Sequence, residues 1–425
     1  ASEGCLFVAI PGERVDGHDF IPSVFEKGAL AVISERELEA PAGPYIQVMS
    51  SLEAVKGIAE YYRQQLDIKV VGITGSVGKT STKEVIASVL KEKYRTLKTQ
   101  GNFNNELGLP LTVFRLRDED EIAVLEMGIS DFGEMTRLAK IAKPDTCVIT
   151  NIGTCHLENL GDRGGGLKAK TEIFQYVKRN IVLNGDDDKL STVKEYNGMQ
   201  PVFFGNGENA SVTCENVESR GLKGMSCDIC LKGKMAENGE LQTFHVDIPM
   251  PGRHMVSNAL AAAAVGRLYG LNAEQIKNGI ESLEPVSGRF NMIETDKFMI
   301  VDDCYNANPM SMKASLDVLQ DGLGRKVAIL GDMGELGTDE AALHEGVGVH
   351  AGQCRIDACI CVGPLAAHIA EKASQTNPDL TVIREKDLES LLKNLNTYVK
   401  PGDTILVKAS HFMKFENVVK ALQEM

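Results

Sequence analysis

Residues 70–85, VVGITGSVGKTSTKEV, decide the fold, because they run from an apolar strand through a glycine-rich bend into a helix. The bend ends on Gly78, Lys79 and Thr80. Backbone N–H groups in such a bend, together with a helix N-terminus, form a cradle for an anion. Ile73 stands where the usual spacing has a glycine. The stretch therefore predicts a shortened variant of the phosphate-binding P-loop.

A P-loop assigns specific roles to its residues. We expect Lys79 to reach the β- and γ-phosphates of a nucleotide and the Thr80 hydroxyl to be an Mg²⁺ ligand. The backbone of the loop would surround the phosphates. The residues expected to line the nucleotide are Thr74, Gly75, Ser76, Val77, Gly78, Lys79 and Thr80.

Two further polar residues follow apolar strands. Glu126 ends the strand of AVLEMG, and His156 comes shortly after VITNIG. Parallel sheets place their sites at the carboxyl ends of strands, and a P-loop needs a carboxylate for its metal. We therefore predict that both residues meet the loop. Taken singly, Glu126 could be a surface glutamate and His156 a hydrogen-bonded loop histidine.

Composition sets limits on the class of protein. The 425 residues exceed the size of one hydrophobic core, so two or three domains are expected. A net charge of −14 argues against nucleic acid as a partner, because that role needs clustered positive charge. No apolar run approaches the ~20 residues that span a bilayer. The ten cysteines are scattered, and we expect reduced, mostly buried thiols in a cytoplasmic protein.

The strand pattern predicts three α/β domains. Residues 1–67 read as a small N-terminal α/β domain, and residues 68–285 as a central domain with a mostly parallel sheet. Alternating runs in 210–250 indicate an antiparallel insert. The strand–helix rhythm restarts after EPVSGRF, which makes 286–425 a C-terminal α/β domain.

Several segments occur in the order seen in Mur ligases, and the resemblance covers essentially the whole chain. The stretches DDCYNANP and LGDMGELG resemble most the branch of the family that adds D-Ala-D-Ala. The segments are TGSVGKTS, GNFNNELGLP, LEMG, NIGTCHLENLG, KAKTEIF, PGRHMVSNALAAAA, SGRF and VDDCYNANP.

The resemblance implies a central P-loop ATPase domain, an N-terminal domain for the UDP end of a substrate and a Rossmann-like C-terminal domain. It also implies an enzyme of peptidoglycan synthesis, and so of cell wall biogenesis, cell shape and division. ATP would phosphorylate the terminal carboxylate of UDP-N-acetylmuramoyl-tripeptide, and the amine of D-Ala-D-Ala would attack the acyl phosphate. We expect a monomer without a membrane span.

The resemblance also assigns residues. Glu126 and His156 match metal-binding positions, and Lys170 matches a lysine that becomes a carbamate and binds a second Mg²⁺. Without the family, Lys170 reads as a solvated charge and Arg289 as a surface arginine in a linker. Arg289 follows a hinge glycine and could close onto the γ-phosphate. The matching nucleotide-contacting positions are Asn258, Arg289, Asp303, Tyr305 and Asn306, and the muropeptide side has Asn104 and Asn105.

Three features depart from the family pattern. An Asp-Ser-Arg-type segment precedes the family's equivalent of residues 2–20, and this chain begins after it, so we expect incomplete uridine contacts. Three glycines, Gly164–Gly166, should delay the start of the helix that carries Lys170 or leave that helix mobile, since each costs ~1 kcal/mol there. VKASH replaces a commoner Lys-Gly-Ser stretch, so Lys408 receives no role.

Two other functions remain open from sequence. A related Mur or folylpolyglutamate-type ligase would add a single amino acid instead of D-Ala-D-Ala. A P-loop regulatory ATPase would hydrolyse ATP without any muropeptide. This second interpretation leaves the C-terminal domain unexplained.

Overall fold

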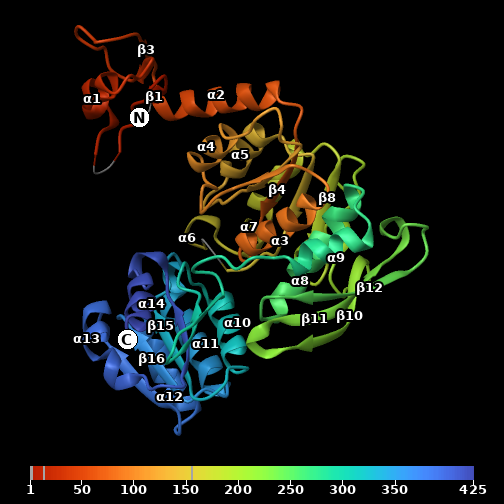
Figure 1. Cartoon of the computed structure of the whole chain (residues 1–425), viewed down its shortest axis with the longest axis vertical. Helices are drawn as coiled ribbons and strands as arrows, with labels where there is room; N and C mark the ends of the chain where they lie inside the picture. The colour runs from red at the N-terminus through yellow and green to blue at the C-terminus, as the bar shows by residue number, and fades with distance from the viewer. Residues whose placement is uncertain (1–2, 13–14, 155–156) are drawn as a thin grey trace.

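The computed structural model describes residues 3–12, 15–154 and 157–425, which fold into three α/β units, each around its own sheet (Figure 1). This confirms the predicted three-domain α/β architecture. The N-terminal unit projects from one end of helix α2, away from the rest of the molecule. No helix in the described part of the chain is long and apolar enough to cross a bilayer.

The N-terminal unit holds a small parallel sheet in the order β1-β2-β3. Helix α2 follows it, but its buried face packs against α4 and α5 of the central unit. The guanidinium of Arg63 on α2 donates to the carbonyl oxygens of Ala142, Leu66 and Ile68, which ties the helix to that unit. The elements are β1 (Leu6–Val8), α1 (Ile21–Glu26), β2 (Ala31–Ser34), β3 (Tyr45–Gln47) and α2 (Ser51–Gln65).

The central unit has a nine-stranded sheet in the order β12-β11-β10-β9-β8-β7-β4-β6-β5. Strands from β5 to β10 pair in parallel, and β11 and β12 continue antiparallel. The predicted antiparallel insert therefore extends the main sheet. The strands are β4 (Lys69–Thr74), β5 (Thr96–Lys98), β6 (Ile122–Glu126), β7 (Thr146–Ile149), β8 (Asn180–Asn184), β9 (Val202–Phe204), β10 (Ala210–Ser219), β11 (Met225–Leu231) and β12 (Gln242–Ile248).

Helices cover both faces of this sheet, as buried parallel strands require. Helices α3, α8 and α9 pack together on one face, and α4 and α5 lie on the other with α2. The helices are α3 (Lys79–Lys91), α4 (Gly108–Val113), α5 (Glu134–Ala142), α6 (Leu157–Leu160), α7 (Arg163–Thr171), α8 (Arg253–Leu268) and α9 (Ala273–Glu281).

One expectation about the central unit is wrong. The glycines at 164–166 do not delay the helix, since α7 begins at Arg163. Asp162 caps it by accepting a hydrogen bond from the Gly165 N–H at 2.8 Å. A side-chain cap of this kind stabilises a helix by ~1 kcal/mol, which offsets part of the cost of the glycines.

The C-terminal unit has a six-stranded sheet in the order β13-β14-β18-β15-β16-β17, parallel except for the β13–β14 pair. Its elements are β13 (Asn291–Glu294), β14 (Met299–Asp302), α10 (Pro309–Leu319), β15 (Lys326–Gly331), α11 (Glu340–Gln353), β16 (Ala358–Val362), α12 (Ala366–Thr376), β17 (Thr381–Glu385), α13 (Leu388–Tyr398), β18 (Thr404–Lys408) and α14 (Glu416–Gln423).

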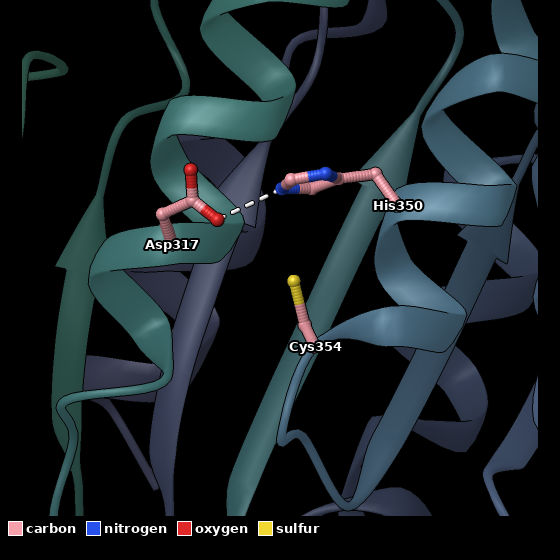
Figure 2. A group of neighbouring side chains, drawn as sticks. All are labelled: Asp317, His350 and Cys354. Carbon is pink, nitrogen blue, oxygen red and sulfur yellow. Dashed lines mark hydrogen bonds and ion pairs between the residues drawn. The ribbon is translucent and has the colours of Figure 1, made fainter.

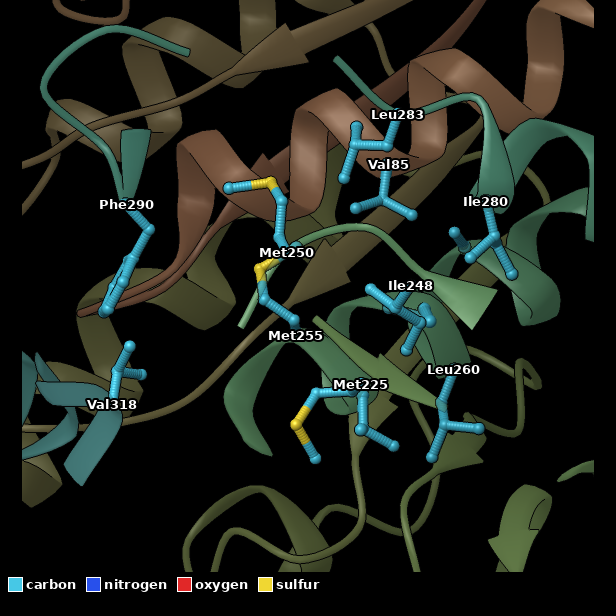
Figure 3. Close-up of a cluster of buried hydrophobic side chains, with 14 of the residues drawn as sticks. Val85, Met225, Ile248, Met250, Met255, Leu260, Ile280, Leu283, Phe290 and Val318 are labelled. Carbon is cyan, nitrogen blue, oxygen red and sulfur yellow. The ribbon is translucent and has the colours of Figure 1, made fainter. Parts of the chain in front are cut away.

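An apolar contact joins the central and C-terminal units. Met250 and Met255 of the central unit belong to the same buried cluster as Phe290 and Val318 of the C-terminal unit (Figure 3). The Phe290 ring also packs on His254, with 4.7 Å between ring centroids. Because this contact is closely packed, it fixes how the strand ends of the two sheets face each other.

The described cysteines are free thiols, and all except Cys5 are buried. Cys227 and Cys230 lie three residues apart on β11, so their side chains point to opposite faces of the sheet. This pair is therefore unsuited to binding one metal ion.

Two helical glycines give a matched test of the packing. A Cβ at Gly279 on α9 would lie 2.4 Å from the Cα of Val89 on α3, whereas one at Gly57 on α2 would meet nothing within 4 Å. We expect Gly279→Ala to lower the free energy of unfolding by about 1–3 kcal/mol through overpacking. Gly57→Ala should raise it by ~0.5 kcal/mol, because alanine favours the helix. Urea unfolding midpoints measure both, and equal effects would contradict the close α3–α9 contact.

Candidate functional site

The P-loop is anchored on the end of the neighbouring strand β7. Asn151 accepts a hydrogen bond from the Val77 N–H and donates one to the Val77 carbonyl, both at 2.9 Å. Thr150 Oγ1 also donates to that carbonyl, at 2.6 Å. A Cβ at Gly75, where φ is +147°, would lie 2.0 Å from Thr150 Oγ1. This close approach requires glycine and holds the loop in one shape.

Helix α3 begins at Lys79, directly after Gly78, whose φ is +82°. The first turn of the helix therefore faces the space beyond the loop with its N-terminus, which attracts anions. Lys79 Nζ donates to the Gly75 carbonyl at 2.8 Å. These features agree with the predicted phosphate cradle.

Glu126 is the centre of the site. It ends β6, is 2% exposed, and accepts hydrogen bonds from Thr80 Oγ1 at 3.0 and 3.2 Å. Asn104 Nδ2 donates to Glu126 Oε1 at 2.8 Å. The structure thus brings together two of the four residues that were predicted as Mg²⁺ ligands, Thr80 and Glu126. It also rules out the reading of Glu126 as a surface residue.

Lys83 was missed by sequence reasoning. Its ammonium is 3.6 Å from Glu126 Oε2 and 3.1 Å from Glu84 Oε1, and its side chain is 1% exposed. Lys98 in turn pairs with Glu84. A carboxylate removed from water loses its solvation, and a nearby cation offsets part of that cost. Lys83 therefore supports Glu126 from the side of helix α3.

The C-terminal unit contributes a second buried ion pair. Lys408 Nζ donates to Asp303 Oδ2 at 2.6 Å and to the Asn306 carbonyl at 2.9 Å. Ser315 Oγ donates to the same Asp303 oxygen at 2.7 Å. Lys408, which the sequence left without a role, thus fixes the shape of the loop 303–306.

Arg289 lies on the ring of Tyr305, with its guanidinium carbon 4.4 Å from the ring centroid. Burial raises the pKa of Tyr305, so the ring stays uncharged. Among the described residues, Arg289 has no carboxylate within ion-pair distance. It lies just after Gly288, whose φ is +73°. The side chain is therefore placed to meet an anion.

Several of these groups line one cleft of about 370 Å³ between the central and C-terminal units. His254 also lines it, and burial lowers the pKa of its imidazole to about 4, which keeps the ring neutral. Among the predicted residues, those that line the cleft are Ser76, Val77, Gly78, Lys79, Thr80, Asn104, Asn105, Glu126, Arg289, Asp303, Tyr305 and Asn306.

Other predicted residues lie beside the cleft. Asn258 Oδ1 accepts a hydrogen bond from Thr82 Oγ1 at 2.9 Å, so this side chain joins helix α8 to helix α3. Asn105, which does line the cleft, accepts through its Oδ1 a hydrogen bond from the Gly108 N–H at 2.8 Å, where α4 begins. Thr74 is fully buried beneath the loop.

Lys170 lies on α7 and is 2% exposed, so the reading of a solvated surface charge is wrong. Burial of a lysine is costly, so its charge must be compensated inside the protein. His156, the remaining predicted metal ligand, lies outside the described residues.

The buried cation beside Glu126 can be tested by substitution. Lys83→Met leaves Glu126 and Glu84 without the buried ammonium group. We therefore expect the free energy of unfolding to fall by about 3 kcal/mol. Lys91→Met changes an exposed lysine of the same helix and should cost less than ~0.5 kcal/mol. Urea denaturation measures both. A Lys83→Met protein as stable as the Lys91→Met control would show that Lys83 contributes no net stabilisation.

Comparison with known proteins places the chain in a family. Three family models match in succession: "Mur ligase family, catalytic domain" over residues 1–70, "Mur ligase middle domain" over 73–266, and "Mur ligase, glutamate ligase domain" over 288–411. The UDP-N-acetylmuramoyl-tripeptide–D-alanyl-D-alanine ligase of Bacillus subtilis is 39% identical over 424 residues. That match covers 99% of this chain and 90% of the relative.

Solved structures agree in fold. MurF from Acinetobacter baumannii superposes with a TM-score of 0.89 at 31% identity, covering 100% of this chain and 92% of that one. MurF ligase from Thermotoga maritima, solved in complex with ADP, gives 0.85 at 32% identity, covering 100% and 95%. The relatives match along the whole of this chain, through both halves of the cleft. This chain belongs to the Mur ligase family.

Proposed function

We propose that this chain is an ATP-dependent amide ligase that joins D-Ala-D-Ala to UDP-N-acetylmuramoyl-tripeptide in peptidoglycan precursor synthesis. The proposal rests on one observation: two sets of polar residues, one from the central unit and one from the C-terminal unit, face each other across one cleft. The Thr80–Glu126 pair and the P-loop lie on one side, and Arg289 with the Asp303–Lys408 pair lies on the other. Full-length relatives that carry the name of this activity support the choice of substrates.

We propose a division of labour along the chain. Residues 1–67 would bind the UDP end of the substrate, residues 68–285 would bind ATP, and residues 286–425 would close over the nucleotide. The protein would act as a monomer in the cytoplasm, where ATP is available.

The nucleotide would lie in the cleft with its phosphates on the P-loop. Lys79 and the first turn of α3 supply positive charge there. Arg289 would add charge from the opposite side, and Tyr305 and Asn306 would contact the base side. The rings of Tyr305 and His411 lie 5.3 Å apart, centroid to centroid, and offer an aromatic surface for stacking. Asn258 would act indirectly, because its hydrogen bond with Thr82 holds helix α3 in position under the phosphates.

The residues present fit Mg²⁺. A hydroxyl and a carboxylate, those of Thr80 and Glu126, already lie within hydrogen-bonding distance, and hard cations prefer oxygen ligands. His156 and a carbamate on Lys170 would complete the ligands of two ions. A carbamate would turn the buried lysine into an oxygen ligand. Bound Mg²⁺ would supply neutralisation of charge between two anions that otherwise repel.

The reaction would proceed by two displacements. A terminal carboxylate oxygen of the tripeptide attacks the γ-phosphorus, and the bond to ADP breaks. The D-Ala-D-Ala amine then attacks the acyl carbon, a C–N bond forms, and phosphate leaves with one former carboxylate oxygen. The amine also gives up a proton. Lys79 and Arg289 would hold the transferred group in place, and positioning of this kind supplies most of the catalysis in phosphoryl transfer.

Two alternatives lead to different measurements. A ligase that adds a single amino acid would form product with L-lysine or L-glutamate in place of D-Ala-D-Ala. A regulatory ATPase would release phosphate without any muropeptide.

The fate of an isotope tests the proposal. We expect UDP-N-acetylmuramoyl-tripeptide labelled with ¹⁸O in its terminal carboxylate to pass one label to released phosphate when D-Ala-D-Ala is present. Mass spectrometry of the phosphate measures this. Phosphate that carries oxygen from water would instead mean direct hydrolysis of ATP, and the ligase proposal would fail.

Chemical rescue tests Lys170. We expect Lys170→Ala to lose nearly all activity and to recover part of it when short carboxylic acids supply the missing oxygens. Lys168→Ala, on the same helix but more exposed, is the matched control and should stay active. A fully active Lys170→Ala enzyme would remove the carbamate from the mechanism.

A further inference from the structure

Three side chains of metal-binding type converge between α10 and α11, at a place that the proposed ligase reaction does not use. They are Asp317 on α10, His350 on α11 and Cys354 directly after α11 (Figure 2). Asp317 is nine residues from Asn308 at the start of α10, and nine residues of helix rise ~13 Å. The group is therefore separate from the catalytic cleft.

The spacing of the group follows from helix geometry. His350 and Cys354 are four residues apart at the end of α11, and this spacing puts both side chains on one face. Asp317 faces them from the neighbouring helix. The potential ligand atoms all lie within 4.8 Å of one another, and His350 Nε2 is 2.8 Å from Asp317 Oδ1. Figure 2 shows the thiol pointing toward the carboxylate and the ring.

The three groups differ in exposure. The Asp317 side chain is 57% exposed and that of His350 is 27% exposed, whereas Cys354 is buried. Burial, with Asp317 nearby, raises the pKa of the Cys354 thiol to about 12. A thiol held in this state is inert, but a metal ion that enters from the Asp317 side would displace its proton into solvent.

The ligand chemistry selects the ion. A thiolate and an imidazole favour Zn²⁺ or a similar transition metal, whereas Mg²⁺ and Ca²⁺ prefer oxygen. Three protein ligands leave one tetrahedral position for water. Gln320 Nε2 also donates to Asp317 Oδ1, at 3.4 Å, so a metal would compete with this weak contact and with the His350 pair.

We propose that Asp317, His350 and Cys354 form a binding site for a divalent transition metal of the Zn²⁺ type, which clips α10 to α11. Helix α10 also carries Ser315, which holds Asp303 of the cleft. The site is independent of the proposed ligase function, because none of its ligands lines the cleft.

Cobalt is a suitable probe, because Co²⁺ bound to a thiolate has an absorption band in the near-ultraviolet that Co²⁺ bound only to oxygen lacks. The band therefore reports binding to the cysteine. We titrate the reduced, metal-free, untagged full chain with Co²⁺. We expect a thiolate–Co²⁺ absorption that saturates at one equivalent and is displaced by Zn²⁺. Cys354→Ser should abolish this absorption, and His350→Ala and Asp317→Asn should weaken binding at least ~10-fold.

Two matched controls separate this site from other groups. His245 pairs with Asp228 at 2.7 Å but has no cysteine in its group, and Cys5 is a partly exposed thiol outside any such group. His245→Ala and Cys5→Ser should bind Co²⁺ as the unchanged chain does. If Cys354→Ser does not fold, the exposed Asp317→Asn variant decides the question. The absence of thiolate absorption, or its persistence in Cys354→Ser or at full affinity in Asp317→Asn, would overturn the proposal.

Discussion

A carboxylate that is almost fully buried must be compensated by its neighbours, and Glu126 is the carboxylate on which this site depends. Thr80 and Lys83, both on α3, contact it from one side, and Asn104, from the segment before α4, contacts it from another part of the central unit. Their contacts fix the end of β6 against the P-loop helix. The same contacts leave the carboxylate beside the place where nucleotide phosphates would lie. One charge therefore orders both the local fold and the proposed metal site.

The C-terminal unit repeats this arrangement with different residues. Asp303 is compensated by Lys408 and Ser315, and the pair fixes the loop after β14. Both buried carboxylates lie near the carboxyl ends of strands in mostly parallel sheets, where ligand sites of α/β proteins form. The apolar contact through Met255 and Phe290 then holds the two strand ends toward each other. The cleft thus lies where residues at the strand ends of two separate sheets face each other.

Local pattern was enough to predict the P-loop side of this site, whereas the residues of the C-terminal unit were assigned from the family resemblance. The strand, bend and helix of residues 70–85 are read directly from apolar periodicity and glycine, and the Thr80–Glu126 contact follows from strand order. Lys83 could not be predicted, because its helical position looks the same whether the lysine faces solvent or a buried glutamate. Lys408 and Asp303 are 105 residues apart, and their pairing depends on β14 lying beside β18. Such register is a property of the folded sheet and leaves no local signal.

The whole chain is acidic, whereas the charges of the described residues that line the cleft are balanced: three cations, Lys79, Arg289 and Lys408, occur with three carboxylates, Glu126, Asp303 and Glu335. The chain carries a net charge of −14, whereas the proposed substrates are anions that the overall field would repel. Screening limits that repulsion to about 8–10 Å at physiological salt. Inside the cleft, the cations at Lys79 and Arg289 act at close range in a partly buried setting, where each is stronger than a distant surface charge. Lys83 and Lys408 are held by carboxylates, so they set the shape of the site and add little net attraction. The capacity to hold phosphate therefore depends on Lys79, on Arg289 and on the N-terminus of α3, which begins at Lys79.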